Sequence, residues 1–584
     1  MSGETAGKPS GRALALLPVL AGLFVLAFYQ VCDPDVFWQI KVGEVVLDTG
    51  RMVRTNVFAA SYADHPWFNP EWLFQVGIAL AYRGGGWVGV ALFKFALLGV
   101  LAGLLHALLL ARRRAPLLAA GIALAVFAAM RFRFTERPQL ASLILFTATL
   151  LVVERARAGR PRLLWALPPL FALWSNLHAE LLLGILWLAG TAVGGWVDAR
   201  LARRRAGEAV SPAGGVGPGR LALAALACAL ASGANPGGYR VLYHPFPHFW
   251  QESIVDLGEF HWSHPAWVPL VWVLIAAVVA TACVPRTRRA FADLLPLLGL
   301  AVLAVRYMRE IPFFALAAAP WLQGALPGLL PDGRRARRWL EAGVAAAALG
   351  CGVWAMRFDA SMHYRWGYGV SDFFPVQAAD FVLREKLPGN LYNHYIDGGY
   401  LLFRLYPRLG VYQDGRLSAY PVEFMARMHA QHNGREWAEN LETYRINTAV
   451  VPVVDARLFF PADRWQVVHA DARYAVVVRR SAANAGLIAH LTATAQARTP
   501  AGEAYLRGSQ MMRSGRYADA AAAYREATRL DPAYADAWHN LGSALAAEGR
   551  IEEGIAALEE ALRLRPDFAM ARSRLEFLRT RRAR

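Results

Sequence analysis

Residues 13–39, ALALLPVLAGLFVLAFYQVCDPDVFWQ, place a long apolar run directly before an acidic turn. The run extends to about residue 31 and follows Lys8 and Arg12. It approaches the ~20 residues that a helix needs to cross a bilayer, and no small-residue cleavage pattern follows it. We therefore expect an uncleaved first span and not a signal peptide. Asp33-Pro34-Asp35 then lies where this span would leave the membrane.

The composition fits burial in a bilayer. Of the 584 residues, 56% are hydrophobic and only 18% are charged. The net charge of +18 comes from arginines in short clusters between apolar runs, which is typical of membrane topology signals, so we expect no nucleic-acid partner. The cysteines show no spacing typical of a disulfide framework or a metal site; they are Cys32, Cys228, Cys283 and Cys351.

Further apolar stretches approach spanning length and bring the expected total to about eleven spans. They are 87–111, 115–130, 139–153, 163–177, 180–197, 220–234, 266–284, 290–305, 312–330 and 339–356. Basic clusters follow every second span, as expected for cytoplasmic loops. They are Arg112–Arg114, Arg155–Arg162, Arg200–Arg205, Arg286–Arg289 and Arg334–Arg338. The sequence thus predicts a polytopic α-helical membrane bundle over 1–356, with a cytoplasmic N-terminus and everything after about residue 357 outside the cytoplasm.

The loops on the opposite face carry the candidate chemistry. Arg131, Arg133 and Arg137 violate the positive-inside bias in a short outer loop, and Arg306 and Arg309 occupy a later one. Arginine suits phosphate oxygens, so these side chains are candidates to bind the phosphate of a lipid-linked donor. In the alternative interpretation, Glu136 and headgroup phosphates simply neutralise them.

Asp33 and Asp35 lie at the level where a lipid phosphate and an acceptor would meet. A carboxylate there could deprotonate an acceptor hydroxyl or hold a divalent cation such as Mg or Mn. The alternative is an Asp-Pro turn that ends a helix. Other outer-loop polar groups could position substrate or cap helices; they are Glu71, His178, Glu180 and Asn235.

Together these outer-loop strings resemble the GT-C superfamily of polyprenyl-phosphate-dependent glycosyltransferases, which includes protein mannosyltransferases and oligosaccharyltransferases. The resemblance covers roughly residues 10–480. The strings are Asp35-Val36-Phe37-Trp38-Gln39, Gly43, Asn69-Pro70-Glu71-Trp72-Leu73, Arg137-Pro138, Asn176-Leu177-His178 and Asn235-Pro236.

The resemblance implies a GT-C-like bundle and an inverting transfer from a polyprenyl-phosphate-linked sugar. It also implies an essential acidic residue in the first outer loop, which maps to Asp35 or to its neighbour Asp33. The chain departs from related bacterial sequences at Gln39, where a histidine is frequent, and this departure puts a metal or phosphate role of that position in doubt.

Residues 357–480 have mixed composition and predict a small extracytoplasmic α/β domain. Strands are expected at 391–395, 448–454 and 474–478, and helices at 376–386 and 423–438. Glycine turns at Asp397-Gly398-Gly399 and Gln413-Asp414-Gly415-Arg416 could form an acceptor-binding rim, although ordinary strand-end turns look the same. Residues 481–500 are expected to form a linker or a first helix.

The C-terminal region repeats with a period of 34 residues, which is the tetratricopeptide period. The recurring positions are Gly508, Ala520, Tyr524, Ala527 and Pro532, then Gly542, Gly554, Leu558, Ala561 and Pro566. We expect repeats at 501–534 and 535–568 and a capping helix at 569–584. Their groove would bind a protein or peptide partner, with Tyr505, Trp538 and Asn540 as candidate contacts.

The leading functional hypothesis is a membrane glycosyltransferase that moves a sugar from a polyprenyl-phosphate donor to an acceptor on the extracytoplasmic side. Two alternatives remain: a non-enzymatic membrane scaffold that recruits envelope proteins through its repeats, and a flippase or polymerase of lipid-linked saccharides. The excess of arginine and alanine over lysine suggests a GC-rich bacterial genome. We therefore expect a multi-pass protein of the bacterial inner membrane with a periplasmic C-terminal region.

Overall fold

The computed structural model describes most of the chain. The described residues are 11–113, 115–206, 216–243, 263, 268–283, 290–326, 342, 343, 346, 350, 365–424, 435–496, 500–566 and 568–582. The chain divides into two compact units, residues 1–459 with 471–476 and residues 460–470 with 477–584. Most of the expected span at 339–356 and the basic clusters Arg286–Arg289 and Arg334–Arg338 lie outside the described residues.

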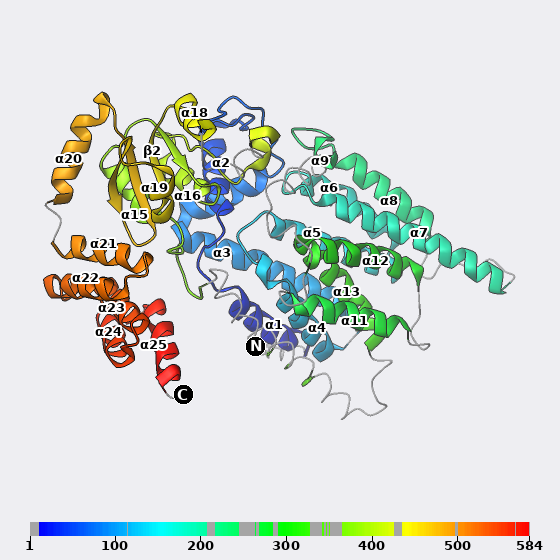
Figure 1. Cartoon of the computed structure of the whole chain (residues 1–584). Helices are drawn as coiled ribbons and strands as arrows, with labels where there is room; N and C mark the ends of the chain where they lie inside the picture. The colour runs from blue at the N-terminus through cyan, green and yellow to red at the C-terminus, as the bar shows by residue number, and fades with distance from the viewer. Residues whose placement is uncertain are drawn as a thin grey trace, which may run out of the picture. The chain divides into compact units, whose positions relative to one another are not determined.

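The first unit begins with a helical bundle whose helices follow the apolar runs closely (Figure 1). Its longer helices are α1 (Gly11–Ala27), α3 (Trp72–Arg112), α4 (Pro116–Met130), α5 (Gln139–Arg157), α7 (Leu181–Ala206), α8 (Pro218–Ala231), α11 (Pro269–Cys283), α12 (Phe291–Arg306) and α13 (Ile311–Ala325). Helix α3 breaks at Gly85 and Gly86, which lie outside the helical conformation. The uninterrupted apolar part of α3 therefore begins at Trp87, as the expected span at 87–111 requires.

Packing within the bundle follows the sequence order only in part. Helix α3 packs on α5, α13 packs on α4, and α7 lies between α8 and α12 (Figure 1). A continuous apolar core fills these contacts, with side chains such as Leu105, Phe127 and Phe146 fully buried. The apolar runs thus pack against one another along their length.

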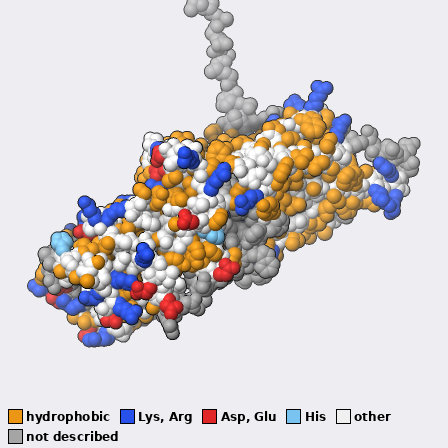
Figure 2. All heavy atoms as spheres, turned by 90° about the horizontal axis from the view of Figure 1, so that it is seen from above, with side chains coloured by type: hydrophobic (Ala, Val, Ile, Leu, Met, Phe, Trp, Pro, Cys, Tyr) orange, Lys and Arg blue, Asp and Glu red, His pale blue; other side chains and the backbone are white. Residues whose placement is uncertain are grey.

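The outside of the bundle is also hydrophobic. Figure 2 shows hydrophobic side chains over much of its surface, and Leu92, Leu226 and Val302 are each more than half exposed. Within the described residues, four helices are long and apolar enough to cross a membrane: Trp72–Arg112, Pro116–Arg133, Gln139–Arg157 and Leu181–Arg204. Because α1, α8 and α11 are apolar but shorter, the expected total of about eleven spans stays a prediction.

Short elements join the helices at the end of the bundle where α5 begins. Helix α2 (Asp35–Thr49) packs on α3, and the turns η1 (Arg131–Arg133) and η5 (Met308–Glu310) precede α5 and α13. The expected span at 163–177 is instead divided into η2 (Pro161–Ala166) and α6 (Leu167–Trp174). Pro168 and Pro169, which lack a backbone N–H, fall at the start of α6.

A four-stranded sheet follows, with strand order β1-β2-β4-β3 and a parallel β1–β2 pair. The strands are β1 (Asn390–Asn393), β2 (Ile446–Pro452), β3 (Trp465–Ala470) and β4 (Tyr474–Arg479). The associated helices are α15 (Val376–Arg384), α16 (Tyr395–Leu405), α18 (Arg435–Thr443) and α19 (Val453–Phe459). The expected helix at 423–438 falls largely outside the described residues.

The interpretation of Asp397-Gly398-Gly399 as a strand-end turn is wrong. These residues lie inside α16, which packs on α2. A Cβ atom on Gly398 would lie 1.9 Å from the carbonyl oxygen of Gln413, and one on Gly399 would lie 2.3 Å from that of Pro34. The two glycines therefore serve close backbone approach and not a turn.

The second unit contains the repeat helices. Helix α20 (Ala485–Gln496) occupies most of the expected linker, and the two repeats are α21 (Pro500–Arg513) with α22 (Tyr517–Leu530) and α23 (Ala535–Ala547) with α24 (Ile551–Leu564). Helix α25 (Ala569–Arg582) packs on α24 as the expected cap. Gly542 and Gly554 face each other between α23 and α24, where a Cβ on Gly542 would lie 2.7 Å from the Gly554 carbonyl oxygen.

Candidate functional site

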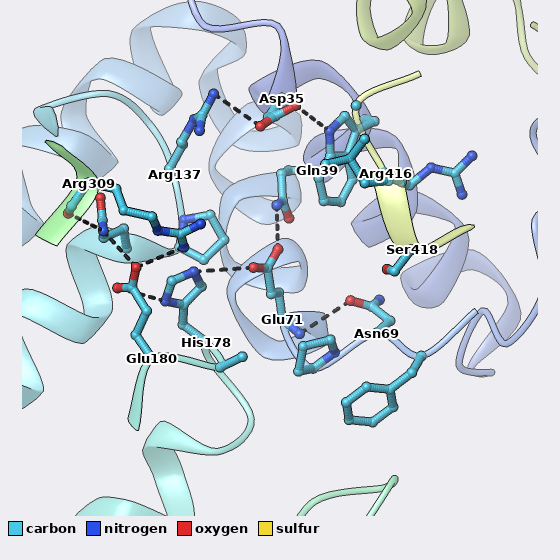
Figure 3. Close-up of a pocket in the computed structure, with 18 of the residues that line it drawn as sticks. Asp35, Gln39, Asn69, Glu71, Arg137, His178, Glu180, Arg309, Arg416 and Ser418 are labelled. Atoms are coloured by element: carbon cyan, nitrogen blue, oxygen red, sulfur yellow. Dashed lines mark hydrogen bonds and ion pairs between the residues drawn. The ribbon is translucent and has the colours of Figure 1, made fainter. Parts of the chain in front are cut away.

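A cavity of about 200 Å³ lies at the end of the bundle where α5 begins, and most of the sequence-predicted polar groups line it (Figure 3). We call it the polar pocket. Its charged and polar lining includes Asp35, Gln39, Glu71, Arg133, Arg137, Gln139, His178, Glu180, Arg309 and Arg416. Segments far apart in the sequence thus meet in one place, as the loop analysis predicts for Asp35 and three of the five arginines.

The acidic turn after α1 forms one wall of the polar pocket. Asp35 is the first residue of α2, and its backbone N–H donates to Asp33 Oδ1 at 3.0 Å. A carboxylate in the first turn of a helix is stabilised by the helix dipole. Asp33 therefore serves the turn, as the alternative interpretation expects, while the Asp35 side chain lines the pocket.

Arg137 joins the two carboxylates. Its Nε donates to Asp33 Oδ2, and its Nη2 lies 3.1 Å from Asp35 Oδ2. The second oxygen of Asp35, Oδ1, accepts from Trp38 Nε1 at 2.9 Å. One guanidinium thus neutralises a pair of acids that would otherwise repel each other at this end of the bundle.

A second chain of polar contacts crosses the polar pocket (Figure 3). Gln39 Nε2 donates to Glu71 Oε2 at 2.6 Å, and Glu71 Oε1 lies 3.4 Å from His178 Nε2. The other ring nitrogen of His178 lies 3.3 Å from Glu180 Oε2 and 2.9 Å from Ser142 Oγ. The imidazole therefore lies between two carboxylates, an arrangement that can hold or pass on a proton.

Glu180 is held on its far side by α5 and η5. Arg309 Nη2 donates to Glu180 Oε1 at 2.9 Å, and Gln139 Nε2 donates to the same oxygen at 2.7 Å. Glu180 thus contacts His178 through one carboxylate oxygen and Arg309 and Gln139 through the other, and these contacts fix its orientation.

Gln39 leaves one acceptor open to the polar pocket. The side chain is buried, and within the described part of the chain its Oε1 has no hydrogen-bond partner. Buried polar groups are usually paired, so an unpaired amide oxygen in a pocket wall suits a donor from a ligand, such as a hydroxyl.

The region after the bundle contributes a wall to the polar pocket through the Gln413–Arg416 string, for which the sequence left an acceptor-binding rim and an ordinary turn as alternatives. A Cβ atom on Gly415 would lie 2.1 Å from Asp35 Oδ1 and 3.1 Å from Trp38 Nε1. No other residue could therefore approach the acid so closely without displacing it. The glycine in the Gln413–Arg416 string was the sequence signal for this close contact. It does not show that Asp35 is the residue it contacts.

Arg416 fixes this wall. It forms a fully buried pair with Asp414, with Nη2 2.6 Å from Oδ2, and also donates to Asn56 Oδ1 at 2.6 Å. Its guanidinium lies 4.8 Å from the ring centroids of both Phe58 and Trp67. The buried pair with Asp414, which would cost about 3–5 kcal/mol to break, fixes the turn itself, and the contacts with Asn56, Phe58 and Trp67 hold residues 413–416 against the first loop.

Arg131 and Arg306 lie outside the lining of the polar pocket. Arg131 is buried at the end of α4, and the Arg306 guanidinium lies 4.8 Å from the ring centroid of Tyr307. Glu136, the proposed partner of the outer arginines, instead pairs with Lys94 at 2.7 Å, and both side chains are buried. Arg131 and Arg306 thus differ from Arg133, Arg137 and Arg309, whose side chains line the polar pocket.

Asn235 also lies outside the polar pocket lining and links helix ends. Its Nδ2 donates to the Ser175 carbonyl oxygen at 2.6 Å, and its Oδ1 accepts from the Gly237 backbone N–H at 2.7 Å. Asn176 similarly accepts from Trp72 Nε1 at 2.8 Å. These asparagines hold the turns that carry Glu71 and His178.

The candidate contacts in the repeats lie close together. Asn540 Nδ2 donates to Tyr505 Oη at 2.9 Å, which links the first helices of the two repeats. Tyr505 itself is buried, with its ring 4.9 Å from that of Tyr534, and Trp538 Nε1 donates to the Pro532 carbonyl oxygen at 3.0 Å. All three side chains thus have contacts that hold the repeats together.

Comparison with known proteins identifies the fold. Residues 494–567 match the sequence model of the tetratricopeptide repeat. No curated protein sequence matches the chain. Among solved structures, the archaeal oligosaccharyltransferase AglB from Archaeoglobus fulgidus, in complex with an inhibitory peptide and a dolichol-phosphate, aligns with a TM-score of 0.50 at 10% identity over 76% of this chain and 69% of that one.

The chain has a GT-C-like fold. ArnT from Cupriavidus metallidurans, bound to undecaprenyl phosphate, aligns over 80% of this chain and 98% of that one, at 14% identity and a TM-score of 0.48. The AglB alignment and the tetratricopeptide match confirm, for the fold, the resemblance inferred from the outer-loop strings and the repeat period.

Proposed function

We propose that the protein transfers a sugar from a polyprenyl-phosphate lipid donor to an acceptor on the extracytoplasmic side of a bacterial inner membrane. The observation that supports this most is the polar pocket itself, in which Asp35 and the arginines Arg133, Arg137 and Arg309 line one cavity together with other charged groups. AglB, which shares the fold, is described in complex with a dolichol-phosphate. Charges so placed suit a reaction in which a phosphate leaves.

In this proposal Asp35 accepts the proton of an acceptor hydroxyl as its oxygen attacks the anomeric carbon of the sugar. The bond between that carbon and the phosphate oxygen breaks, and the phosphate leaves with the bonding electrons. Arg133, Arg137 and Arg309 neutralise the charge that develops on it. Asp33 and the Glu71–His178–Glu180 chain hold these groups in position.

Arg137 links donor binding to the base. A carboxylate that is paired with a guanidinium is a weak base, because the ion pair favours its charged form. A lipid phosphate that draws Arg137 toward itself would weaken the 3.1 Å contact with Asp35. The base would thus become effective only when the donor is present.

The acids as arranged do not fit a divalent cation. Arg137 contacts both Asp33 and Asp35, so its guanidinium lies where a metal bridging them would sit. Among the residues that the structure describes, no group of three or more His, Cys, Asp or Glu side chains is arranged to hold a metal. We therefore route no step of the reaction through Mg or Mn.

Two alternatives predict different behaviour. A membrane scaffold acting through the repeats would have no use for charged groups in a cavity of the bundle, since burying them costs free energy. A flippase or polymerase of lipid-linked saccharides would use the arginines but would not depend on Asp35. The repeats would bind a protein or peptide partner in any of these cases.

The test is transfer of radiolabelled sugar by the purified chain from polyprenyl-phosphate sugars to extracted envelope acceptors. Asp35→Asn should lower the rate by about 10²–10⁴-fold, the usual contribution of a general base. Asp48→Asn, an exposed acid on the same helix that pairs with Arg83, is the matched control and should retain activity. Undiminished transfer by Asp35→Asn would eliminate the mechanism.

A further inference from the structure

Helix α2 separates two cavities. Asp35, Trp38 and Gln39 line the polar pocket, whereas Lys41 and Glu44 line a second cavity of about 270 Å³. At 100° per residue, these two sets lie on opposite faces of the helix. The second cavity is lined by Lys41, Glu44, Tyr82, Trp87, Val370, Tyr400, Phe403 and Arg404, none of which the proposed reaction uses.

Aromatic rings form much of the second cavity. The Tyr82 and Trp87 ring centroids are 5.0 Å apart, and the Phe403 ring lies 5.3 Å from Tyr82 and 5.8 Å from Trp87. Lys41 Nζ lies 5.4 Å from the centroid of Phe403. Such rings attract organic cations through their faces, and they do so more strongly where water is partly excluded.

Charges of both signs lie beside these rings. Lys41 Nζ is 2.7 Å from Glu44 Oε2, and both side chains are less than one-fifth exposed. Arg404 donates to Tyr400 Oη at 3.0 Å and to Asp380 Oδ1 at 2.6 Å. A simple anion would meet the Glu44 carboxylate, and a simple cation would meet Lys41 and Arg404.

The second cavity lies where the apolar part of α3 begins. Trp87 follows the break at Gly85 and Gly86 directly, and Tyr82 precedes it. Leu80, Val88 and Leu92, which neighbour these aromatic residues in the chain, are each at least half exposed. Tryptophan and tyrosine favour the membrane–water boundary, so their presence here suits a cavity at the level of lipid headgroups, beside side chains that suit acyl chains.

We propose that this second cavity binds a zwitterionic headgroup that carries a phosphate and a primary ammonium, as in a phosphoethanolamine lipid. The phosphate faces Lys41 and Arg404, which supply charge-assisted donors. The ammonium faces the Glu44 carboxylate and the rings of Tyr82 and Trp87. A zwitterion satisfies both signs of charge at once, and its acyl chains continue along the exposed apolar side chains of α3.

Native mass spectrometry of the full chain in detergent tests the proposal with phosphatidylethanolamine, phosphatidylglycerol and phosphatidylcholine of equal acyl length. We expect phosphatidylethanolamine to be retained about tenfold more tightly than the other two, because only it combines a phosphate with a small ammonium that reaches Glu44. Glycerophosphoethanolamine, the soluble headgroup, should compete weakly. Equal binding of the soluble headgroup and the lipid would overturn the membrane as the source.

A double substitution distinguishes a loss of lipid recognition from a loss of folding. Lys41→Glu with Glu44→Lys keeps the ion pair of α2 but reverses its direction, and should remove most of the preference for phosphatidylethanolamine. Arg507→Glu with Glu526→Arg reverses an exposed pair between α21 and α22, 2.6 Å apart and outside the lining of this cavity, and should leave the preference unchanged.

Three results would overturn the proposal: equal retention of the three lipids, a preference that survives the Lys41 and Glu44 exchange, or competition by neutral monosaccharides. The last result would assign the aromatic rings to a sugar. The measurement does not depend on transferase activity, so its failure would leave the proposed reaction untouched.

Discussion

Helix α5 has a cluster of arginines and carboxylates at each end, and the two clusters differ in what surrounds them. At its C-terminal end, Arg112 lies 2.9 Å from Glu154 and 2.7 Å from Asp293, and Arg157 lies 2.6 Å from Asp293. We call these four residues the closing cluster. At the N-terminal end, Arg137 pairs with Asp33 and Asp35 in the wall of a cavity.

The charges of the closing cluster join helices to one another, whereas the charges of the polar pocket border a cavity. The closing cluster has two arginines and two acids that pair among themselves, and its residues join α3, α5 and α12. The charges of the polar pocket are equally well paired, yet they line an open volume. Ion pairing by itself therefore does not indicate a site, whereas ion pairing around a cavity does.

The largest expected contrast comes from replacing one arginine of each cluster. Arg137→Gln should lower transfer by about 10²–10³-fold, because it removes a donor to the leaving phosphate and frees two acids from their common partner. Arg157→Gln should retain transfer and lower the thermal midpoint, because it leaves Asp293 with one arginine fewer.

Both variants should be measured in parallel for transfer rate and for thermal unfolding in detergent. If Arg157→Gln abolished transfer while the fold persisted, the distinction between the two clusters would be wrong. If Arg137→Gln changed only the midpoint, the arginine would be structural and the phosphate role would belong elsewhere.

The next contrast concerns the second polar chain of the pocket. His178→Asn keeps a polar side chain but removes the contact between Glu71 and Glu180, so we expect transfer to fall by about 10–100-fold with the Asp35 mechanism intact. The pH profile of kcat is the deciding measurement, because only a proton-carrying role would change its shape. Thr147→Val, on a buried α5 residue that donates to the Leu143 carbonyl oxygen, is a control for packing changes in the same helix.

Sequence reasoning could predict much of the bundle but only part of the polar pocket. Helices α4, α5 and α12 begin and end within a few residues of the predicted spans, since prolines and arginines bound their apolar runs. Topology also predicted that Asp35, Arg137, His178 and Arg309 would meet, because all were assigned to loops on one side. Their common pocket agrees with that assignment.

The other features of the polar pocket depend on how each turn orients its side chains and on contacts between distant residues. A short stretch of sequence shows neither of these. Arg131 and Arg133 are two residues apart in one short turn, yet only Arg133 lines the polar pocket. Gln139 and Ser142 contact Glu180 and His178 through the first turns of α5, and neither follows a recognisable motif. The contact of Gly415 with Asp35 joins positions 380 residues apart, so only a folded chain reveals it.

Gly415→Ala tests that long-range contact. The added methyl group would lie 2.1 Å from Asp35 Oδ1, so either the acid or residues 413–416 must move. We expect transfer to fall by about tenfold, because misplacing a reacting group by even a fraction of an ångström is costly. Gly99→Ala in α3, whose Cβ would meet nothing within 4 Å, is the matched control and should leave transfer unchanged.

The last contrast concerns stability, at a carboxylate that is held by a hydroxyl group instead of an arginine. Asp397 Oδ1 accepts from Tyr474 Oη at 2.6 Å, and burial raises the pKa of Asp397 from 3.8 to about 7. The folded state therefore binds more protons than the unfolded state between those values, so stability should fall as pH rises from about 4 to 7.

The slope of that fall should be at most ~1.4 kcal/mol per pH unit, which is the value for one proton. Asp397→Asn should flatten it, whereas Asp372→Asn, at an exposed acid that pairs with Arg365, should not. Thermal midpoints of the full chain at several pH values would measure both. If the slope survives Asp397→Asn, a group other than Asp397 titrates in this pH range. The Asp397 carboxylate would then be charged in the folded state although a hydroxyl group and not an arginine holds it, as the carboxylates at the two ends of α5 are charged.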